Sequence, residues 1–103
     1  MANVDIQSID EVIHGRVRLG IMAYLAGAGS ADFLTLKEQL QSSDGNLSVH
    51  LRKLEEAGYV TVAKSFREKR PHTEVQLSPQ GREAFLRYLD SLRGLLGGTS
   101  GTG

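Results

Sequence analysis

The amino-acid sequence predicts a mainly α-helical domain with a small β-hairpin. Apolar residues recur at helical spacing over 47–57, while the positions between them are polar or basic. Two short runs rich in β-branched and aromatic residues follow at 59–66 and 73–77, with a charged stretch between them. A further helical pattern then extends over 79–96. Helix, hairpin and helix in this order are the basis of the fold prediction.

The length and composition of the chain predict one small globular domain. Its 103 residues are 40% hydrophobic and 23% charged, which is ordinary for such a domain. The lack of cysteine excludes disulfides, thiolate zinc sites and cysteine nucleophiles. The longest apolar stretch, 19–28, is well short of the roughly 18 residues that span a membrane, and no signal peptide is visible, so we expect a cytoplasmic protein. Residues 97–103 have nothing to bury and are expected to be a disordered tail.

The first helix is predicted by the capping box Ser8-Ile-Asp-Glu11, with Ser8 as its N-cap. Apolar residues continue at helical spacing after it, so we expect a helix over 9–26. Gly15 weakens this pattern, and the helix is expected in one or two pieces. Residues 1–8 then form an N-terminal extension, and Gly27-Ala-Gly-Ser30 forms a loop.

A second, shorter helix is predicted by another capping box, Thr35-Leu-Lys-Glu38, and extends through Leu40. A short strand over 31–34 is expected just before it. Gln41-Ser42 then forms a tight turn. A third helix follows so closely that the two helices predict a helix-turn-helix.

The third helix has a clear start and a clear end. Ser43 is expected as its N-cap, with Asp44 favourable at the positive end of the helix dipole. Gly58 ends the helix, at a position where a left-handed residue is usual.

The hairpin and the last helix complete the fold. The two strands flank the charged turn Arg67-Glu-Lys-Arg-Pro-His72. Ser78-Pro79 then starts a helix that extends to about Leu96, since proline is favoured at the first helical position. The domain over 9–96 therefore has the element order of a winged helix-turn-helix.

Charge is unevenly distributed although the net charge is zero. Residues 1–45 have a balance of −3, residues 46–72 a balance of +3, and residues 73–103 are neutral. The positive charge falls on the third helix and on the turn after it. A local basic face is the electrostatic footprint of nucleic-acid binding, so this distribution indicates a nucleic-acid partner.

The third helix is the candidate recognition helix, because the first two turns of such a helix contact bases. Asn46 can pair with adenine or cap the helix, and Arg52 can reach guanine or a phosphate. Asp44 can accept from a cytosine amine, although capping is the favoured interpretation, and His50 either contacts a phosphate or packs locally. Gly45 lets the backbone approach DNA closely. The predicted DNA-binding positions are Asp44, Gly45, Asn46, Ser48, Val49, His50, Arg52 and Lys53.

The charged turn is the candidate wing. Its basic side chains can contact phosphates or enter the minor groove. Considered alone, the turn resembles an ordinary solvated hairpin tip, but its position after a recognition helix and a strand favours the wing. The predicted contacts of the wing are Lys64, Arg67, Lys69, Arg70 and His72.

The last helix carries an apolar stripe at heptad-like spacing. The stripe packs partly on its own domain, but it continues beyond what a small domain needs to cover. Its exposed end predicts a partner helix and therefore a homodimer. The predicted interface consists of Ile9, Ile13, Phe85, Leu89, Leu92 and Leu96.

No residue pattern supports an enzyme, a metal site or a cofactor. The histidines, His14, His50 and His72, are far apart and lack the spacing of metal ligands. No serine lies in a nucleophile elbow, and no glycine-rich phosphate loop follows a strand. We therefore expect neither catalysis nor a bound cofactor or metal.

Four segments carry a family resemblance: His14-Gly-Arg-Val-Arg-Leu-Gly-Ile-Met-Ala-Tyr-Leu25, Leu36-Lys-Glu-Gln-Leu40, Asp44-Gly-Asn-Leu-Ser-Val-His-Leu-Arg-Lys-Leu-Glu-Glu-Ala-Gly-Tyr-Val60 and Leu77-Ser-Pro-Gln-Gly-Arg-Glu-Ala-Phe85. They resemble the small stand-alone winged helix transcriptional regulators related to the ArsR and MarR families. The resemblance implies a homodimer on a pseudo-palindromic operator, with the third helix in the major groove and the wing on the flanking backbone or minor groove. Metal-sensing members carry cysteines or a further His/Asp/Glu set, and this chain has no cysteine and no histidine after His72.

The sequence thus predicts a sequence-specific transcriptional regulator that binds double-stranded DNA as a homodimer. Whether a small-molecule effector controls it is left open. The alternative is a winged helix that serves as a protein–protein interaction module, in which the basic turn is only solvated. Salt-dependent DNA binding separates the two, because phosphate contacts release counterions.

Overall fold

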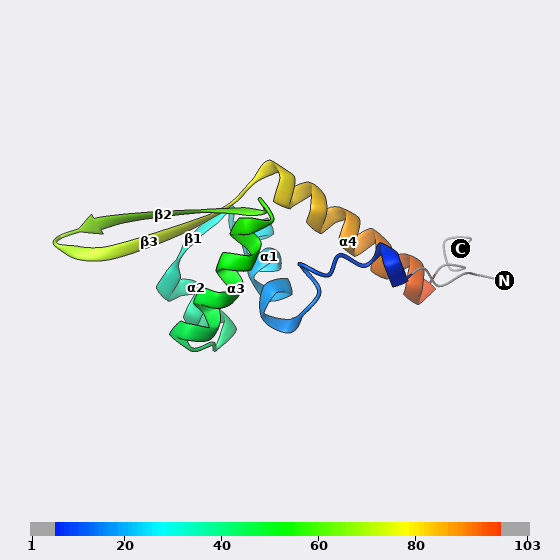
Figure 1. The fold of residues 1–103 in the computed structure, drawn as a ribbon, viewed down its shortest axis with the longest axis horizontal. Coiled ribbons are helices and arrows are strands. Elements are labelled where there is room, and N and C mark those ends of the chain that lie inside the picture. The colour runs from blue at the N-terminus through cyan, green and yellow to red at the C-terminus, as the bar shows by residue number, and fades with distance from the viewer. Residues whose placement is uncertain (1–5, 98–103) are drawn as a thin grey trace.

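The computed structural model describes residues 6–97, which form an elongated molecule with the hairpin at one end and the last helix at the other (Figure 1). Its elements are the 3₁₀ turn η1 (Ile6–Ser8), α1 (Arg16–Ala28), β1 (Ser30–Asp32), α2 (Phe33–Leu40), α3 (Asp44–Glu56), β2 (Val60–Arg67), β3 (Arg70–Leu77) and α4 (Pro79–Gly97). The predicted mainly α fold with a hairpin is confirmed. Gly97, expected in the tail, is the last residue of α4, and the rest of the expected tail and residues 1–5 lie outside the described residues.

A three-stranded antiparallel sheet has the order β1–β3–β2, so β3 lies in its centre. β1 pairs only with the base of the hairpin, from Ser30 opposite Gln76 to Asp32 opposite Glu74. The outer part of the hairpin therefore projects alone from the body of the molecule (Figure 1).

The hairpin is longer and its turn is tighter than the sequence predicted. β2 and β3 pair as far as Arg67 opposite Arg70, which leaves Glu68 and Lys69 as the turn. Both turn residues have positive φ, 52° and 67°, the conformation of the two-residue turn that matches the twist of its strands. The longer predicted turn is wrong because its charged residues lie mostly on paired strands, and His72 lies inside β3.

The segment before α1 is not helical, so the predicted helix over 9–26 is wrong at its start. Asp10, not Ser8, organises this segment. Its Oδ1 accepts hydrogen bonds from the backbone N–H groups of Val12 at 2.9 Å and Ile13 at 3.3 Å. Ile13 is fully buried. The apolar spacing that predicted a helix reflects a turn packed on the core.

α1 extends further than predicted, through Ala28, and only Gly29 of the expected loop separates it from β1. The short strand is present but ends at Asp32. This residue, rather than Thr35, is the N-cap of α2, because its carboxylate accepts from the backbone N–H of Thr35 at 2.7 Å. α2 therefore begins at Phe33.

The predicted ends of α3 are confirmed. Ser43 Oγ accepts a hydrogen bond from the backbone N–H of Asn46 at 3.2 Å, as an N-cap does. At the other end Gly58 has φ 82°, and the N–H groups of Gly58 and Tyr59 bond the last carbonyls of the helix at 2.9 Å. This Schellman motif needs a left-handed residue, which glycine adopts at little cost.

One hydrophobic core joins the helices to the base of the sheet. α3 contributes Leu47, Leu51 and Leu54, each at most 5% exposed. The other buried side chains of the core are Ile13, Ile21, Met22, Leu25, Ala31, Leu36, Val60, Val75, Leu77, Ala84, Phe85 and Tyr88. Among residues 6–97, no helix has both the length and the apolar character needed to cross a membrane.

The hairpin is tied to the helices on either side of it by four residues, Gly58, Tyr59, Ser78 and Gly81, which we name the hairpin clamp. Ser78 Oγ donates to the Gly58 carbonyl at 2.7 Å and accepts from the Gly81 N–H at 2.8 Å, which caps α4. The Ser78 N–H donates to the Tyr59 carbonyl at 3.0 Å. A Cβ atom at Gly81 would lie only 2.0 Å from that carbonyl oxygen. The clamp therefore accepts glycine alone at this position.

The N-terminal segment packs against the clamp and α4. The Tyr59 hydroxyl donates to Asp10 Oδ2 at 2.6 Å, and burial together with this hydrogen bond raises the pKa of Tyr59 to about 12. Nearby, His14 Nδ1 lies 2.8 Å from the Tyr88 hydroxyl. Side chains of α3–β2 and α4 thus hold the segment that precedes α1.

Replacing Gly81 with alanine should lower the free energy of unfolding by about 1–3 kcal/mol, the usual cost of forcing an extra carbon into a packed site. Gly94→Ala in the same helix is the control. A Cβ there meets nothing within 4 Å, so it should raise stability by up to about 1 kcal/mol through helix propensity. Urea unfolding measures both. Equal stability of the two variants would show that the clamp does not require glycine.

Candidate nucleic-acid interface

α3 presents one face to the core and leaves the other open. The exposed residues include most of the predicted contacts: Asp44, Gly45, Asn46, Ser48, Val49, Arg52 and Lys53. Val49, 47% exposed, lies on the side opposite the buried leucines. A Cβ at Gly45 would meet no other atom within 4 Å, so packing within the chain does not require glycine there. The geometry makes these positions available to a ligand as large as a duplex.

The first turn of α3 is held in place by side chains of its own and of α2. Lys37 of α2 lies 2.8 Å from Asp44 in an ion pair. Asn46 Nδ2 donates to Ser42 Oγ at 3.3 Å. These contacts compensate the charge of Asp44 and occupy one donor of Asn46. The sequence favours capping for Asp44, but Ser43 is the N-cap, and Asp44 is the first residue of α3 and pairs with Lys37.

His50 is turned toward α1 rather than toward open solvent. Arg18 of α1 donates from its guanidinium to His50 Nδ1 at 3.0 Å. Burial, and then the charges of Arg18 and Lys53, lower the pKa of His50. His50 is therefore neutral near pH 7 and adds no positive charge to the surface of α3. Of the two interpretations from the sequence, local packing is the one this geometry supports.

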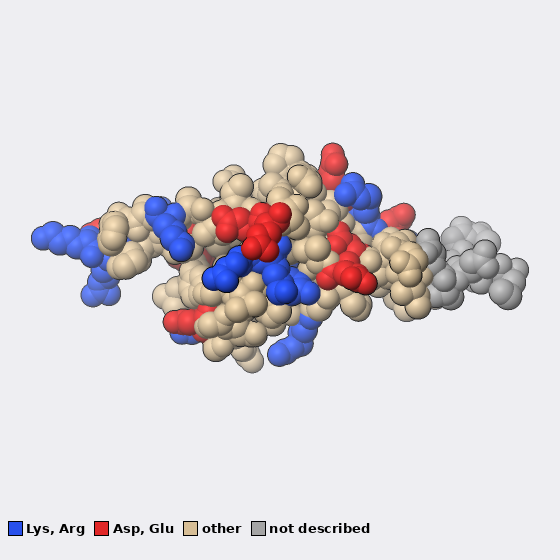
Figure 2. All heavy atoms as spheres, in the orientation of Figure 1, with Lys and Arg blue, Asp and Glu red and all other residues tan. Residues whose placement is uncertain are grey.

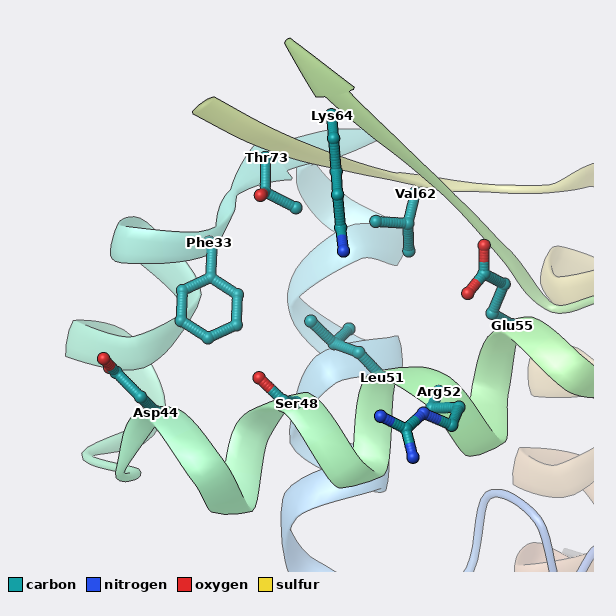
Figure 3. Close-up of a pocket in the computed structure, with 9 residues that line it drawn as sticks. All are labelled: Phe33, Asp44, Ser48, Leu51, Arg52, Glu55, Val62, Lys64 and Thr73. Atoms are coloured by element: carbon teal, nitrogen blue, oxygen red, sulfur yellow. The ribbon is translucent and has the colours of Figure 1, made fainter. Parts of the chain in front are cut away.

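A hollow of about 390 Å³ lies between α3 and the hairpin (Figure 3). Ser48 and Leu51 of α3 face Val62 and Lys64 of β2 across it. Figure 3 shows the Lys64 side chain reaching from β2 toward α3, and the exposed Arg52 side chain lying beside α3. α3 and the hairpin therefore form two walls of one concave surface.

The end of the hairpin is strongly basic, and Figure 2 shows its Lys and Arg side chains gathered at one end of the molecule. Three of the predicted wing cations, Arg67, Lys69 and Arg70, lie in or beside the two-residue turn and are exposed. His72 differs from them, because its Nε2 lies 2.9 Å from Glu74 Oε1 and its side chain is only 17% exposed. His72 is therefore less available to a ligand than the other predicted wing residues.

Acidic side chains gather near the C-terminal end of α3, in the middle of the view in Figure 2. Glu55 and Glu56 are exposed there. Carboxylates repel phosphates, so this end of α3 is electrostatically less favourable for a phosphate backbone than the basic hairpin tip.

The predicted dimer residues fall into three groups, which are buried, half-buried and exposed. Ile13 and Phe85 are 0% and 7% exposed, so both belong to the core of this chain and have little surface left for a second copy. Ile9 and Leu92 are half-buried against that core. Leu89 and Leu96 are 38% and 87% exposed, and Leu86, which the sequence analysis did not single out, is 59% exposed.

Two further residues were missed because their partners are distant in sequence. Lys37 and Arg18 contact α3 from other helices, and no local sequence pattern indicates those contacts. Within residues 6–97, no group of three or more His, Asp or Glu side chains is arranged to hold a metal ion.

The sequence matches the family model of the winged helix DNA-binding domain over residues 17–96. The chain belongs to this family, which defines it as a winged helix transcriptional regulator whose partner is DNA. The uncharacterized protein MJ0432 of Methanocaldococcus jannaschii is 40% identical over 79 residues, which cover 77% of this chain and 86% of that protein.

Solved structures of other proteins have the same fold. A transcriptional regulator homologue from Pyrococcus horikoshii OT3 is 35% identical, with a TM-score of 0.81 over 86% of this chain and 88% of that one. NadR, solved in complex with 4-hydroxyphenylacetate, is 20% identical, with a TM-score of 0.70 over 93% of this chain and 67% of that one. The winged helix prediction is confirmed.

Replacing Arg18 with methionine should raise the pKa of His50, because it removes a neighbouring positive charge and a donor to Nδ1. Arg16→Met, an exposed position in the same helix, is the control and should leave that pKa unchanged. Imidazole NMR titration measures it. In the folded wild-type protein the pKa of His50 lies below 6.5, its value in the unfolded chain. Neutral His50 therefore contributes to the stability of the fold above pH 6.5. This contribution is lost as the pH falls from 6.5 toward the pKa of His50 in the folded protein. An unchanged pKa in Arg18→Met would show that Arg18 does not act on the imidazole.

Proposed function

We propose that this protein is a sequence-specific transcriptional regulator that binds double-stranded DNA as a homodimer. In this proposal α3 enters the major groove, and the hairpin acts as a wing on the flanking backbone or minor groove. The observation that carries the proposal is the single concave surface formed by the exposed side of α3 and the basic hairpin. A duplex is the ligand that offers both a groove for a helix and phosphates for the wing.

The charges of this surface support a defined orientation on DNA. The hairpin tip carries Arg67, Lys69 and Arg70, while Glu55 and Glu56 lie at the far end of α3. Arg52 is exposed in the third turn of α3, from which it can reach a guanine edge or a phosphate. We infer that Arg52 and the first two turns of α3 contact bases and that the wing contacts the backbone or minor groove.

The homodimer rests on the apolar surface of α4. Leu86, Leu89 and Leu96 are exposed on the helix that lies at the opposite end of the molecule from the hairpin (Figure 1). Pairing through α4 would leave both recognition surfaces open. Two-fold symmetry would then place the two α3 helices about 34 Å apart, one turn of DNA, and would favour a two-fold operator.

The loss of a base contact and the loss of phosphate contacts should change the salt dependence of DNA binding differently. Arg52→Ala should weaken binding to an operator selected from random duplexes by about 1–3 kcal/mol, with less effect on unrelated DNA. Replacing Arg67, Lys69 and Arg70 together with alanine should weaken binding to both duplexes and flatten the salt slope by up to about 3 units. Fluorescence anisotropy over a range of salt concentrations measures each quantity.

Arg87→Ala is the control for these variants, since Arg87 is an exposed cation of α4 away from the concave surface. It should bind like the wild type. If all variants bind like the wild type, the surface is misassigned. If the wild type binds no duplex in a salt-dependent way, the alternative, a protein–protein interaction module, replaces the proposal.

The dimer should be broken by charge on the exposed leucines of α4. Leu89→Asp combined with Leu96→Asp should give a folded monomer with weakened operator binding, because it buries two carboxylates in an apolar interface. Leu34→Asp, an exposed leucine of α2, is the matched control and should remain dimeric. Analytical ultracentrifugation at micromolar concentration measures the state. A monomeric wild type would refute the dimer.

A further inference from the structure

Phe66 is an exposed aromatic residue near the tip of the hairpin. It is 75% exposed, and it lies just before Arg67, the last residue of β2. Its sequence pattern predicts only that it belongs to a strand. An isolated apolar residue on a surface is ordinary. What distinguishes Phe66 is the face of the hairpin on which it lies and the charges around it.

Phe66 lies on the face of the hairpin that lines the hollow beside α3. Val62 and Lys64 of β2 and Thr73 of β3 line that hollow. Side chains alternate between faces along a strand, so Phe66, two residues beyond Lys64, shares their face. The register puts Pro71 opposite Phe66, which extends the same face by one more apolar residue. The face of the hairpin that lines the hollow beside α3 therefore carries an aromatic side chain near the tip.

The register also explains how Pro71 fits in the ladder. Arg67 and Arg70 flank the two-residue turn, and such a pair exchanges hydrogen bonds. The next pair, Phe66 and Pro71, is then a non-hydrogen-bonded pair, in which the side chains lie closer and the missing N–H of proline faces away from β2. Phe66 therefore has a rigid apolar neighbour directly across the hairpin.

The cations around Phe66 indicate what kind of ligand covers it. Arg67, Lys69 and Arg70 lie within a few residues of it along the hairpin, and Lys64 shares its face. An apolar protein surface would have to desolvate these charges, which is costly without partners. A polyanion that also presents apolar walls avoids this cost. The minor groove of DNA combines both, since phosphates line its rims and deoxyribose its sides.

We propose that Phe66 packs against the deoxyribose wall of the minor groove and supplies the salt-independent part of wing binding. This rests on the proposed function above and deepens it, by adding an apolar contact to the phosphate contacts of the wing cations. Pro71, opposite Phe66 in the register, adds a second apolar residue to this face. Apolar contact releases no counterions, so its loss changes affinity without changing the salt slope, unlike the loss of a cation.

The test compares Phe66→Ala, Phe66→Leu and the control Ser65→Ala on the same selected duplex. Ser65 is the adjacent residue of β2, and its side chain lies on the other face of the hairpin. Phe66→Ala should bind about tenfold more weakly with the salt slope of the wild type, Phe66→Leu should retain most of the affinity, and Ser65→Ala should bind normally. Hydroxyl-radical footprinting should show the flanking minor-groove protection of the wild type lost in Phe66→Ala, while the protection centred on α3 stays.

Normal affinity and an intact footprint in Phe66→Ala would overturn the proposal, as would a changed salt slope. A change in oligomeric state caused by Phe66→Ala would also overturn it, because Phe66 would then contact protein. Failure of the wild type to bind any duplex is a different result, which refutes the proposed function itself. Because Phe66 is exposed, the variants should fold, and Phe66→Leu checks this with an apolar side chain retained.

Discussion

The hairpin clamp is the constraint on which the geometry of the interface depends. Gly58 lies just after the end of α3, Tyr59 directly precedes β2, and Ser78 connects β3 to α4. Three hydrogen bonds of 2.7–3.0 Å and the close approach of Gly81 to the Tyr59 carbonyl join these chain segments at one point. These contacts join the base of the hairpin to the end of α3, and this places the wall of the hollow formed by β2 beside α3.

The rest of the molecule extends from this point in two directions. The hairpin extends outward with its cations and Phe66, supported by β1 only at its base. α4 extends the opposite way and exposes leucines along its length (Figure 1). Asp10 links the N-terminal segment to the clamp through Tyr59. The elongated shape keeps the surface proposed for DNA apart from the surface proposed for a second copy, so one small domain can serve both contacts.

Much of the fold was predictable because its main signals are local. The leucines of α3, the Ser43 cap and the Gly58 end are short-range patterns, and the structure contains all three. The errors arose where a distant contact decides the conformation. Residues 9–15 have a helical apolar spacing, but Asp10 and the burial of Ile13 give them a packed turn. The orientation of His50 depends on Arg18, 32 residues away, and no local pattern could indicate it. The residues exposed on α3 could be predicted, whereas their partners in other helices could not.

The central claim is that α3 and the hairpin contact adjacent parts of one duplex. The chain has no cysteine, so a single cysteine at Ser48 or, in a second variant, at Lys69 can carry a tethered iron–EDTA cleavage reagent. Both positions are exposed. We expect the tether at Ser48 to cut within each half of a two-fold operator and the tether at Lys69 to cut in the minor groove that flanks the same halves. Cleavage at the same positions from both tethers, or unlocalised cleavage from either, would contradict this account of the interface.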